Sequence, residues 1–265
     1  MFGYSHLNPA AFNADTIPAI YGLPEEGTVS KRYETIPTSS LISLMDDLGW
    51  KPVAGNQIRA RKAGSVKTVK HAIVFQDQNA KANDNGVTGQ VVLVNSHDAK
   101  SSYRLYYGLY RFVCANGLMV GDELAQAKIR HMGKDAVYAN IAEATAKFVK
   151  HSADVNSQID RWMGIKLSCA KQLQFAKDAA LLRFGGEKAE WFRPEAFLAA
   201  RNSEDQANSS LWSTFNRVQE NLVKGGASGR SPKRRIRLRG ISGVDSCINF
   251  NRDLWNLAGE YAAAA

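Results

Sequence analysis

Residues 67–77, KTVKHAIVFQD, and residues 87–98, VTGQVVLVNSHD, decide the fold class of this chain. The first stretch alternates apolar and polar side chains, and the second is a short apolar run rich in β-branched residues, which is typical of a buried strand. Between them, NDNG at residues 83–86 has the composition of a tight turn. The two stretches therefore predict neighbouring antiparallel strands.

The predicted sheet extends in both directions along the chain. WKPVAGNQIRARK at residues 50–62 alternates as a strand does, whereas the tyrosine-rich stretch at residues 101–122 fits either period. For that stretch we favour a strand followed by a short helix.

Helical periodicity dominates after Glu123, and one short helix precedes the sheet. Ser168 and either Ser209 or Ser210 are placed to cap helices, and Gly225 is placed to end one. The expected helices lie at residues 41–50, 122–132, 135–165, 168–186, 194–201, 211–226 and about 248–261. The fold class is therefore α+β, with an antiparallel sheet at about residues 50–113 packed with a mostly helical C-terminal half.

Three regions follow from these patterns. Residues 1–36 contain Pro9, Pro18 and Pro24 and no sustained period, so we expect an extended N-terminal segment. We expect an α+β core domain at residues 37–185 and a helical C-terminal region with a basic strand at residues 186–265.

The composition is that of a globular chain in a reducing compartment. Hydrophobic residues make up 45% of the 265 residues, which is enough for an ordinary core. The three cysteines, Cys114, Cys169 and Cys247, are far apart and form no CxxC pair, which argues against a disulfide framework and against a zinc cluster. The N-terminus has no signal pattern and no run of eighteen apolar residues occurs, so we expect a cytoplasmic protein.

One segment carries most of the net charge. Residues 224–239, KGGASGRSPKRRIRLR, hold seven Lys or Arg and no acid, and without them the formal charge falls from +9 to +2. A run of like charge is often only a solvated surface. Here Ile236 and Leu238 alternate with arginines, which predicts a strand with an arginine face, and forked guanidinium groups suit phosphate oxygens. We therefore favour a contact with a polyanion, and we interpret GGASGR at residues 225–230 as a hinge.

The candidate nucleic-acid contacts come from this basic segment and from the predicted sheet. Cations interleaved with tyrosines can follow phosphates while the rings stack on bases, although tyrosines at these spacings are equally explained as core residues. The candidates are Arg59, Arg61, Lys62, Lys67, Lys70, Arg104, Arg111, Lys233, Arg234, Arg235, Arg237 and Arg239.

No motif supplies a catalytic or cofactor site. The phosphate-binding patterns GxxxxGK[ST] and GxGxxG are absent, and so is the HExxH pattern of a zinc enzyme. A two-metal nuclease needs converging carboxylates, yet the candidate strands at residues 50–94 contain only Asp77 and Asp84. We expect no metal, no cofactor and no catalytic residue.

His97 and Asp98 lie beside Ser96 at the end of the most apolar strand. Neighbouring residues on a strand point to opposite faces, and no GxSxG elbow accompanies them. We interpret Asn95, Ser96 and Asp98 as residues that shape a turn.

The chain resembles a known family in three motifs. These are His97-Asp98, RFVCANG at residues 111–117 with its Asn116, and the late-helix set of Trp212, Asn216 and Gln219. From about Ile36 to Leu257 it is similar to the phage/plasmid-like family of unknown-function domains found in bacteriophages, conjugative plasmids and prophages. That family usually has glycine where this chain has Ala99. The resemblance implies a bacterial host cell and no mechanism.

The order of the expected elements resembles a second group more weakly. A helix, an antiparallel sheet and a long helix also follow one another in single-strand annealing recombination proteins, which oligomerise on single-stranded DNA without nucleotide hydrolysis. This implies a non-catalytic homo-oligomer that binds or anneals single-stranded DNA in recombination or replication. Two alternatives stay open: a host-protein-binding or counter-defence factor, and an enzyme that uses His97 and Asp98.

Overall fold

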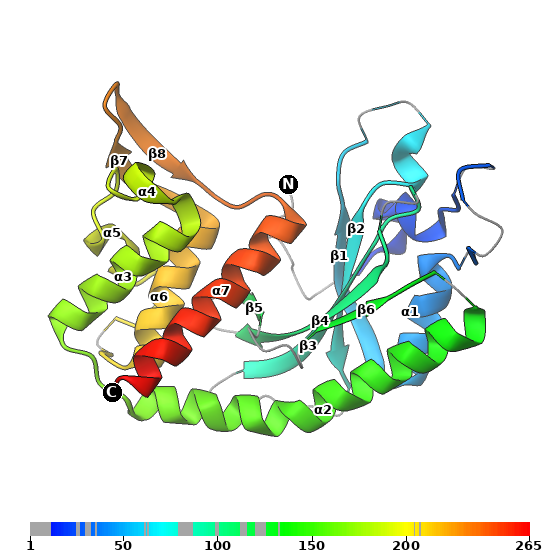
Figure 1. The fold of residues 1–265 in the computed structure, drawn as a ribbon, viewed down its shortest axis with the longest axis horizontal. Helices are drawn as coiled ribbons and strands as arrows, with labels where there is room; N and C mark the ends of the chain where they lie inside the picture. The colour runs from blue at the N-terminus through cyan, green and yellow to red at the C-terminus, as the bar shows by residue number, and fades with distance from the viewer. Residues whose placement is uncertain are drawn as a thin grey trace.

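An antiparallel sheet occupies one end of the molecule and a group of helices occupies the other (Figure 1). The computed structural model describes residues 12–24, 27–29, 33–34, 36–60, 62, 64–78, 87–98, 101–111, 116–119, 126–131, 133–203, 205–206 and 208–265. The predicted α+β class, with a helical C-terminal half, is confirmed.

The sheet contains six strands. Strands β1 (Trp50–Gln57), β2 (His71–Asp77), β3 (Val87–Asn95) and β4 (Tyr103–Arg111) pair in this order, all antiparallel. Two short strands share the far edge of β4: β5 (Asn116–Met119) pairs with its second half and β6 (Gln126–Ile129) with its first half. In β2 and β3 almost every side chain is buried, which explains their nearly continuous apolar sequences.

The sheet is larger than the sequence predicts. Strand β5 occupies the position at which the sequence predicts a short helix. Strand β6 lies inside the helix predicted at residues 122–132. In β6 the exposed Lys128 precedes the buried Ile129, as expected for alternating strand faces. Four residues are too few to separate this period from a helical one, which is why the expectation was wrong.

Seven α-helices lie in the described part of the chain. They are α1 (Thr38–Asp47), α2 (Lys134–Gly164), α3 (Cys169–Phe184), α4 (Gly186–Ala189), α5 (Glu195–Leu198), α6 (Leu211–Lys224) and α7 (Val244–Ala263). As predicted, the Ser168 hydroxyl accepts the N–H of Lys171 at the start of α3. The α6 cap is Ser210, whose hydroxyl accepts the N–H of Ser213 at 3.1 Å.

The N-terminal segment is not extended throughout its described part, contrary to the prediction, but contains short helices. Its described part contains the 3-10 helices η2 (Ala14–Thr16) and η3 (Pro18–Tyr21), and η4 (Ser65–Lys67) lies later, between β1 and β2. Ile17 and Ile20 are each 1% exposed and belong to the hydrophobic core. The segment therefore packs against the sheet end of the protein.

Helix α6 is the centre of the helical half. Nearly all of its side chains are buried, and it contacts α2, α3, α5 and α7. Helix α3 also packs against α5 and α7. Helices before and after residue 185, where we expected one region to end and the next to begin, therefore contact one another. The long helix α2 runs along the bottom of Figure 1, from beneath the sheet to the helices.

A separate two-stranded hairpin projects from the helical half (Figure 1). It consists of β7 (Gly225–Arg230) and β8 (Arg235–Arg239), and we call residues 225–239 the arginine hairpin. The predicted strand is confirmed in β8, since its arginines are exposed whereas Leu238 is buried. The hinge interpretation of residues 225–230 is wrong, because they form β7.

Glycine at the start of β7 has a steric reason. Gly225 ends α6 with φ at 75°, and a Cβ there would lie 2.6 Å from the backbone nitrogen of Gly240. A side chain at this position would therefore push the two strands of the hairpin apart.

Among the described residues, no helix combines the length and the apolar character that a membrane span needs.

Candidate nucleic-acid interface

The arginine hairpin presents a set of exposed cations that form no ion pair within the described part of the chain. Of the described residues, no Asp or Glu forms an ion pair with a Lys or Arg of the hairpin. Elsewhere such pairs do occur: Lys147 pairs with Glu143 at 2.7 Å and Lys224 with Glu220 at 2.6 Å. The exposed cations of the hairpin are Arg230, Lys233, Arg234, Arg235, Arg237 and Arg239. Their charge is therefore left for an external anion.

Backbone contacts hold the hairpin in place. The Arg230 N–H donates to the carbonyl of Trp191 at 2.7 Å, and Phe192 forms an isolated bridge with Gly229. A Cβ at Gly229 would lie 2.5 Å from the carbonyl oxygen of Trp191, so the two backbones approach closely. The turn is closed by the Arg234 N–H, which donates to the Ser231 hydroxyl at 3.2 Å. The hairpin is thus a supported element, with cations at defined spacing.

A hollow of about 500 Å³ lies beside the arginine hairpin. It is lined by Glu190, Trp191, Arg193, Ser228, Gly229, Arg230, Arg235 and Ile236. Sequence reasoning missed Trp191, Arg193 and Arg230 as site residues. The one available signal was an aromatic residue between charges in EWFRP at residues 190–194.

Two candidate cations of the sheet have a partner within the protein. Lys70 Nζ lies 2.5 Å from Asp245 Oδ2, and a terminal nitrogen of Arg104 lies 3.0 Å from Asp245 Oδ1. Burial would raise the pKa of the Asp245 carboxyl, but the two cations outweigh it and hold that pKa below its usual range. Lys70 and Arg104 therefore join the sheet to the first turn of α7, which the sequence did not indicate.

The remaining candidates of the sheet do not join the hairpin. Arg59, Lys62 and Lys67 are exposed in the connection between β1 and β2, which lies far from the hairpin along the long axis of Figure 1. Arg61 lies outside the described residues, as does the side chain of Arg111, the last residue of β4. The structure therefore brings together the candidates at residues 233–239 and leaves the others apart.

The tyrosines of β4 largely belong to the core. Tyr103 and Tyr107 are 0% and 2% exposed, and the Tyr103 hydroxyl donates to the carbonyl of Ile36 at 2.8 Å. For these two rings the core interpretation is confirmed. Tyr106 is half-buried.

The family-motif residues of α6 support the fold. Trp212 packs against Trp162, Phe215 and Trp255 with ring centroids 5.7–6.5 Å away. The Asn216 amide donates to the Trp212 carbonyl at 2.7 Å. The Gln219 amide donates to Asn251 of α7 at 2.8 Å. Asn116 begins β5, and its side chain lies outside the described residues.

His97 belongs to a buried histidine cluster that the sequence did not reveal. Its ring stacks on His71 with centroids 5.4 Å apart, and Thr38 Oγ1 lies 2.8 Å from His71 Nε2 and 3.3 Å from His97 Nε2. His131, 5% exposed, packs on Tyr103 with centroids 3.8 Å apart. The three histidines come from separate strands or strand ends, so their spacing in the sequence does not predict that they lie together. Asp98 instead accepts the Ser96 hydroxyl at 2.6 Å, as expected of residues that shape a turn. The turn role predicted for Asn95 is wrong, because Asn95 ends β3 and its amide donates to Thr38 Oγ1 at 3.1 Å.

The histidine cluster predicts a loss of stability in mild acid. Burial lowers the pKa of His71 and His131 to about 4 and of His97 to about 3. The unfolded chain, with histidine pKa near 6.5, binds more protons below that pH, so stability is present above pH 6.5 and lost as pH falls towards 4. We expect the free energy of unfolding, measured by urea denaturation, to fall by on the order of 5 kcal/mol between pH 6.5 and 5.

A variant separates this effect from carboxylate titration. His97→Gln removes one titrating group, so its free energy of unfolding should depend less steeply on pH, by up to about 1.4 kcal/mol per pH unit. An unfolding free energy that is flat from pH 6.5 to 5 in the wild type would contradict the prediction.

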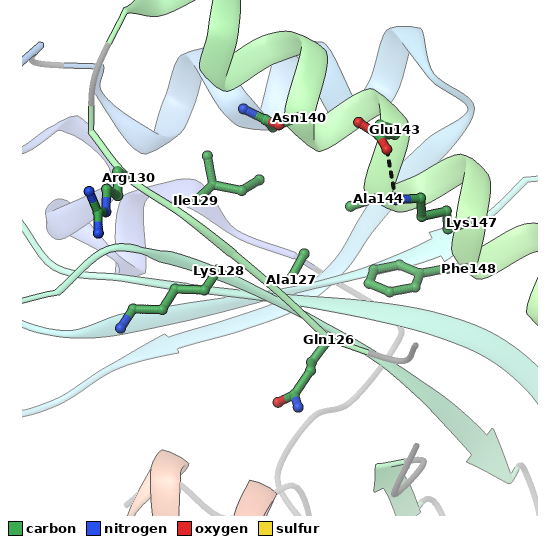
Figure 2. Close-up of a pocket in the computed structure, with 10 residues that line it drawn as sticks. All are labelled: Gln126, Ala127, Lys128, Ile129, Arg130, Asn140, Glu143, Ala144, Lys147 and Phe148. Carbon is green, nitrogen blue, oxygen red and sulfur yellow. Dashed lines mark ion pairs between the residues drawn. The ribbon is translucent and has the colours of Figure 1, made fainter. Parts of the chain in front are cut away.

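A second hollow, of about 530 Å³, lies between β6 and α2 (Figure 2). Figure 2 shows Glu143 paired with Lys147, while Gln126 and Lys128 extend away from α2. The charged groups therefore do not converge on one ligand position. Within the described residues, no group of three or more His, Cys, Asp or Glu side chains could hold a metal ion.

Comparison with known proteins places the chain among domains of unknown function. Residues 26–255 match the family model described as "Domain of unknown function (DUF932)". UPF0380 protein YafZ of Escherichia coli (strain K12) is 32% identical over 247 residues, covering 91% of this chain and 87% of the relative. UPF0380 protein YfjQ of the same organism is 31% identical with the same coverage. No solved structure matches the chain significantly.

Proposed function

This chain belongs to the DUF932 family of domains of unknown function, and we propose that it binds nucleic acid through the arginine hairpin. The proposed ligand is single-stranded DNA in recombination or replication, and the proposed action is binding or annealing without catalysis. We also propose that the protein is of phage or plasmid origin and acts as single-strand annealing proteins do. It would act as a homo-oligomer in the bacterial cytoplasm.

One observation carries the proposal. Six exposed cations lie on a backbone-supported hairpin, and no acid in the described part of the chain pairs with them. Five of the six are arginines, which bind phosphate oxygens through two parallel hydrogen bonds. Such contacts position a nucleic acid without reading its sequence.

A salt titration tests the proposal. Each phosphate that a protein cation neutralises on a single strand lowers the slope of log affinity against log salt by about 0.7, so six contacts give a slope of about −4. We expect this slope with single-stranded DNA in fluorescence anisotropy, with duplex DNA and RNA as parallel ligands and a strand-annealing assay as the functional measurement. Absent binding, or binding that ignores salt, would rule the proposal out.

A second candidate ligand is an acidic protein, and one observation favours it. The guanidinium of Arg183, near the end of α3, donates to the Arg239 carbonyl at 3.4 Å, so α3 ends beside the hairpin. The preceding Leu181 and Leu182 are 50% and 46% exposed, and exposed apolar side chains beside cations are typical of protein interfaces. If a host protein is the ligand, Leu181→Ser with Leu182→Ser should abolish its capture while leaving DNA binding unchanged.

A further inference from the structure

We infer that the hollow beside the arginine hairpin is a nucleobase pocket, in which Trp191 stacks on an unpaired base while Arg230 and Arg235 hold the neighbouring phosphates. This inference rests on the proposed function and names the ligand class of that site: a single strand whose bases are free. The hollow, of about 500 Å³, has the size of pockets that bind small molecules.

Trp191 differs from the other tryptophans of the chain. Trp50, Trp162, Trp212 and Trp255 are each at most 3% exposed and belong to the core. Trp191 is half-buried and lines the hollow. Its indole packs in part against the core and is in part exposed. A partly exposed indole next to guanidinium groups is a combination by which proteins bind single strands, because rings stack on bases while cations follow the phosphates.

The charges around Trp191 orient such a ligand. Arg193, Arg230 and Arg235 line the hollow together with a single acid, Glu190. A carboxylate repels phosphate but accepts hydrogen bonds from the N–H groups of a base. The phosphates therefore belong on the arginine side of the hollow, and the edge of the base belongs towards Glu190.

The platform is fixed before any ligand binds. Phe192 is 8% exposed and stacks on Phe184 with centroids 5.2 Å apart, so the residue after Trp191 is anchored in the core. The Trp191 carbonyl accepts the Arg230 N–H, which fixes the tryptophan backbone against β7. A stacking ring and a phosphate ligand held at set spacing bind without the cost of ordering flexible segments.

The same geometry discriminates against duplex DNA. A base that is paired and stacked must first be extruded, which costs a few kcal/mol. A single strand avoids this cost. Trp191 therefore supplies the preference for single strands, whereas the arginines bind both ligands.

Trp191→Ala and Trp191→Phe test the pocket with an oligothymidylate of about 15 nucleotides and a duplex of the same length. In the wild type, the oligothymidylate should quench tryptophan fluorescence, and the quenching should vanish in Trp191→Phe because the remaining tryptophans are buried. Trp191→Ala should weaken single-strand binding by about tenfold or more, and Trp191→Phe should retain most of it. Duplex affinity should change less than twofold in both variants.

Tyr21→Ala is the matched control, since Tyr21 is 52% exposed and lies in η3, outside the hollow. It should leave both affinities unchanged, and circular dichroism confirms that each variant is folded. If the wild type shows salt-dependent binding but Trp191→Ala loses nothing and no quenching occurs, the base pocket is wrong while the proposed function stands. If the wild type binds neither ligand, both are wrong.

Discussion

Replacing Arg234, Arg235 and Arg237 together by alanine is expected to weaken single-strand binding by on the order of 50-fold at 0.15 M salt. Each lost phosphate contact removes about 0.7 from the salt slope, which corresponds to roughly fourfold in affinity at this salt concentration. The loss should be the same for every base sequence, because phosphate contacts carry no base information. Fluorescence anisotropy with several oligonucleotides, each titrated with salt, measures both quantities.

Two controls define what the arginines contribute. Alanine at Lys150, Lys166 and Lys171 removes the same formal charge from exposed positions outside the hairpin and should change affinity by less than threefold. Lysine at the three hairpin positions keeps the charge, so the salt slope should stay near the wild-type value while the paired hydrogen bonds are lost. Equal losses from the hairpin triple and the distant triple would mean that net charge alone, and not the hairpin, attracts the ligand.

Apolar runs predicted the central strands, and periodicity predicted the long helices, because both patterns follow from burial. Strands β2 and β3 are buried on both faces, and α2 and α6 keep helical spacing over many residues. The sequence pattern did not predict the short elements. Strand β6 has only four residues, and β7 is rich in glycine, so its pairing with β8 comes from the tertiary structure and not from side-chain pattern.

Local side-chain pattern also explains which part of the candidate nucleic-acid interface the sequence predicted. The arginine face of β8 follows from local alternation, and it is the face that the structure exposes. The partnership of Lys70 with Asp245 joins residues 175 positions apart, so no local pattern contains it. Trp191 likewise lies at the hairpin through tertiary contacts, namely the Arg230 N–H on its carbonyl and the bridge of Phe192 with Gly229.

Replacing Trp212 by alanine is expected to lower the free energy of unfolding by about 3–5 kcal/mol. Trp212 is 3% exposed and packs between α2 and α7, against Trp162 and Trp255. Its removal leaves a cavity where three helices meet, and such a loss is a large part of the stability of an ordinary domain. Urea denaturation followed by circular dichroism measures it.

Trp191→Ala is the matched change at the hairpin. Trp191→Ala and Trp212→Ala should have opposite effects on stability and on single-strand affinity. Trp191 is half-buried, so its removal should cost little stability and much single-strand affinity. Trp212→Ala should bind with wild-type affinity at temperatures where it is fully folded, because its ring contacts only core residues. If folded Trp212→Ala lost nucleic-acid binding without losing stability, the family motif of α6 would be part of the binding site, and the assignment of that motif to the helical core would be wrong.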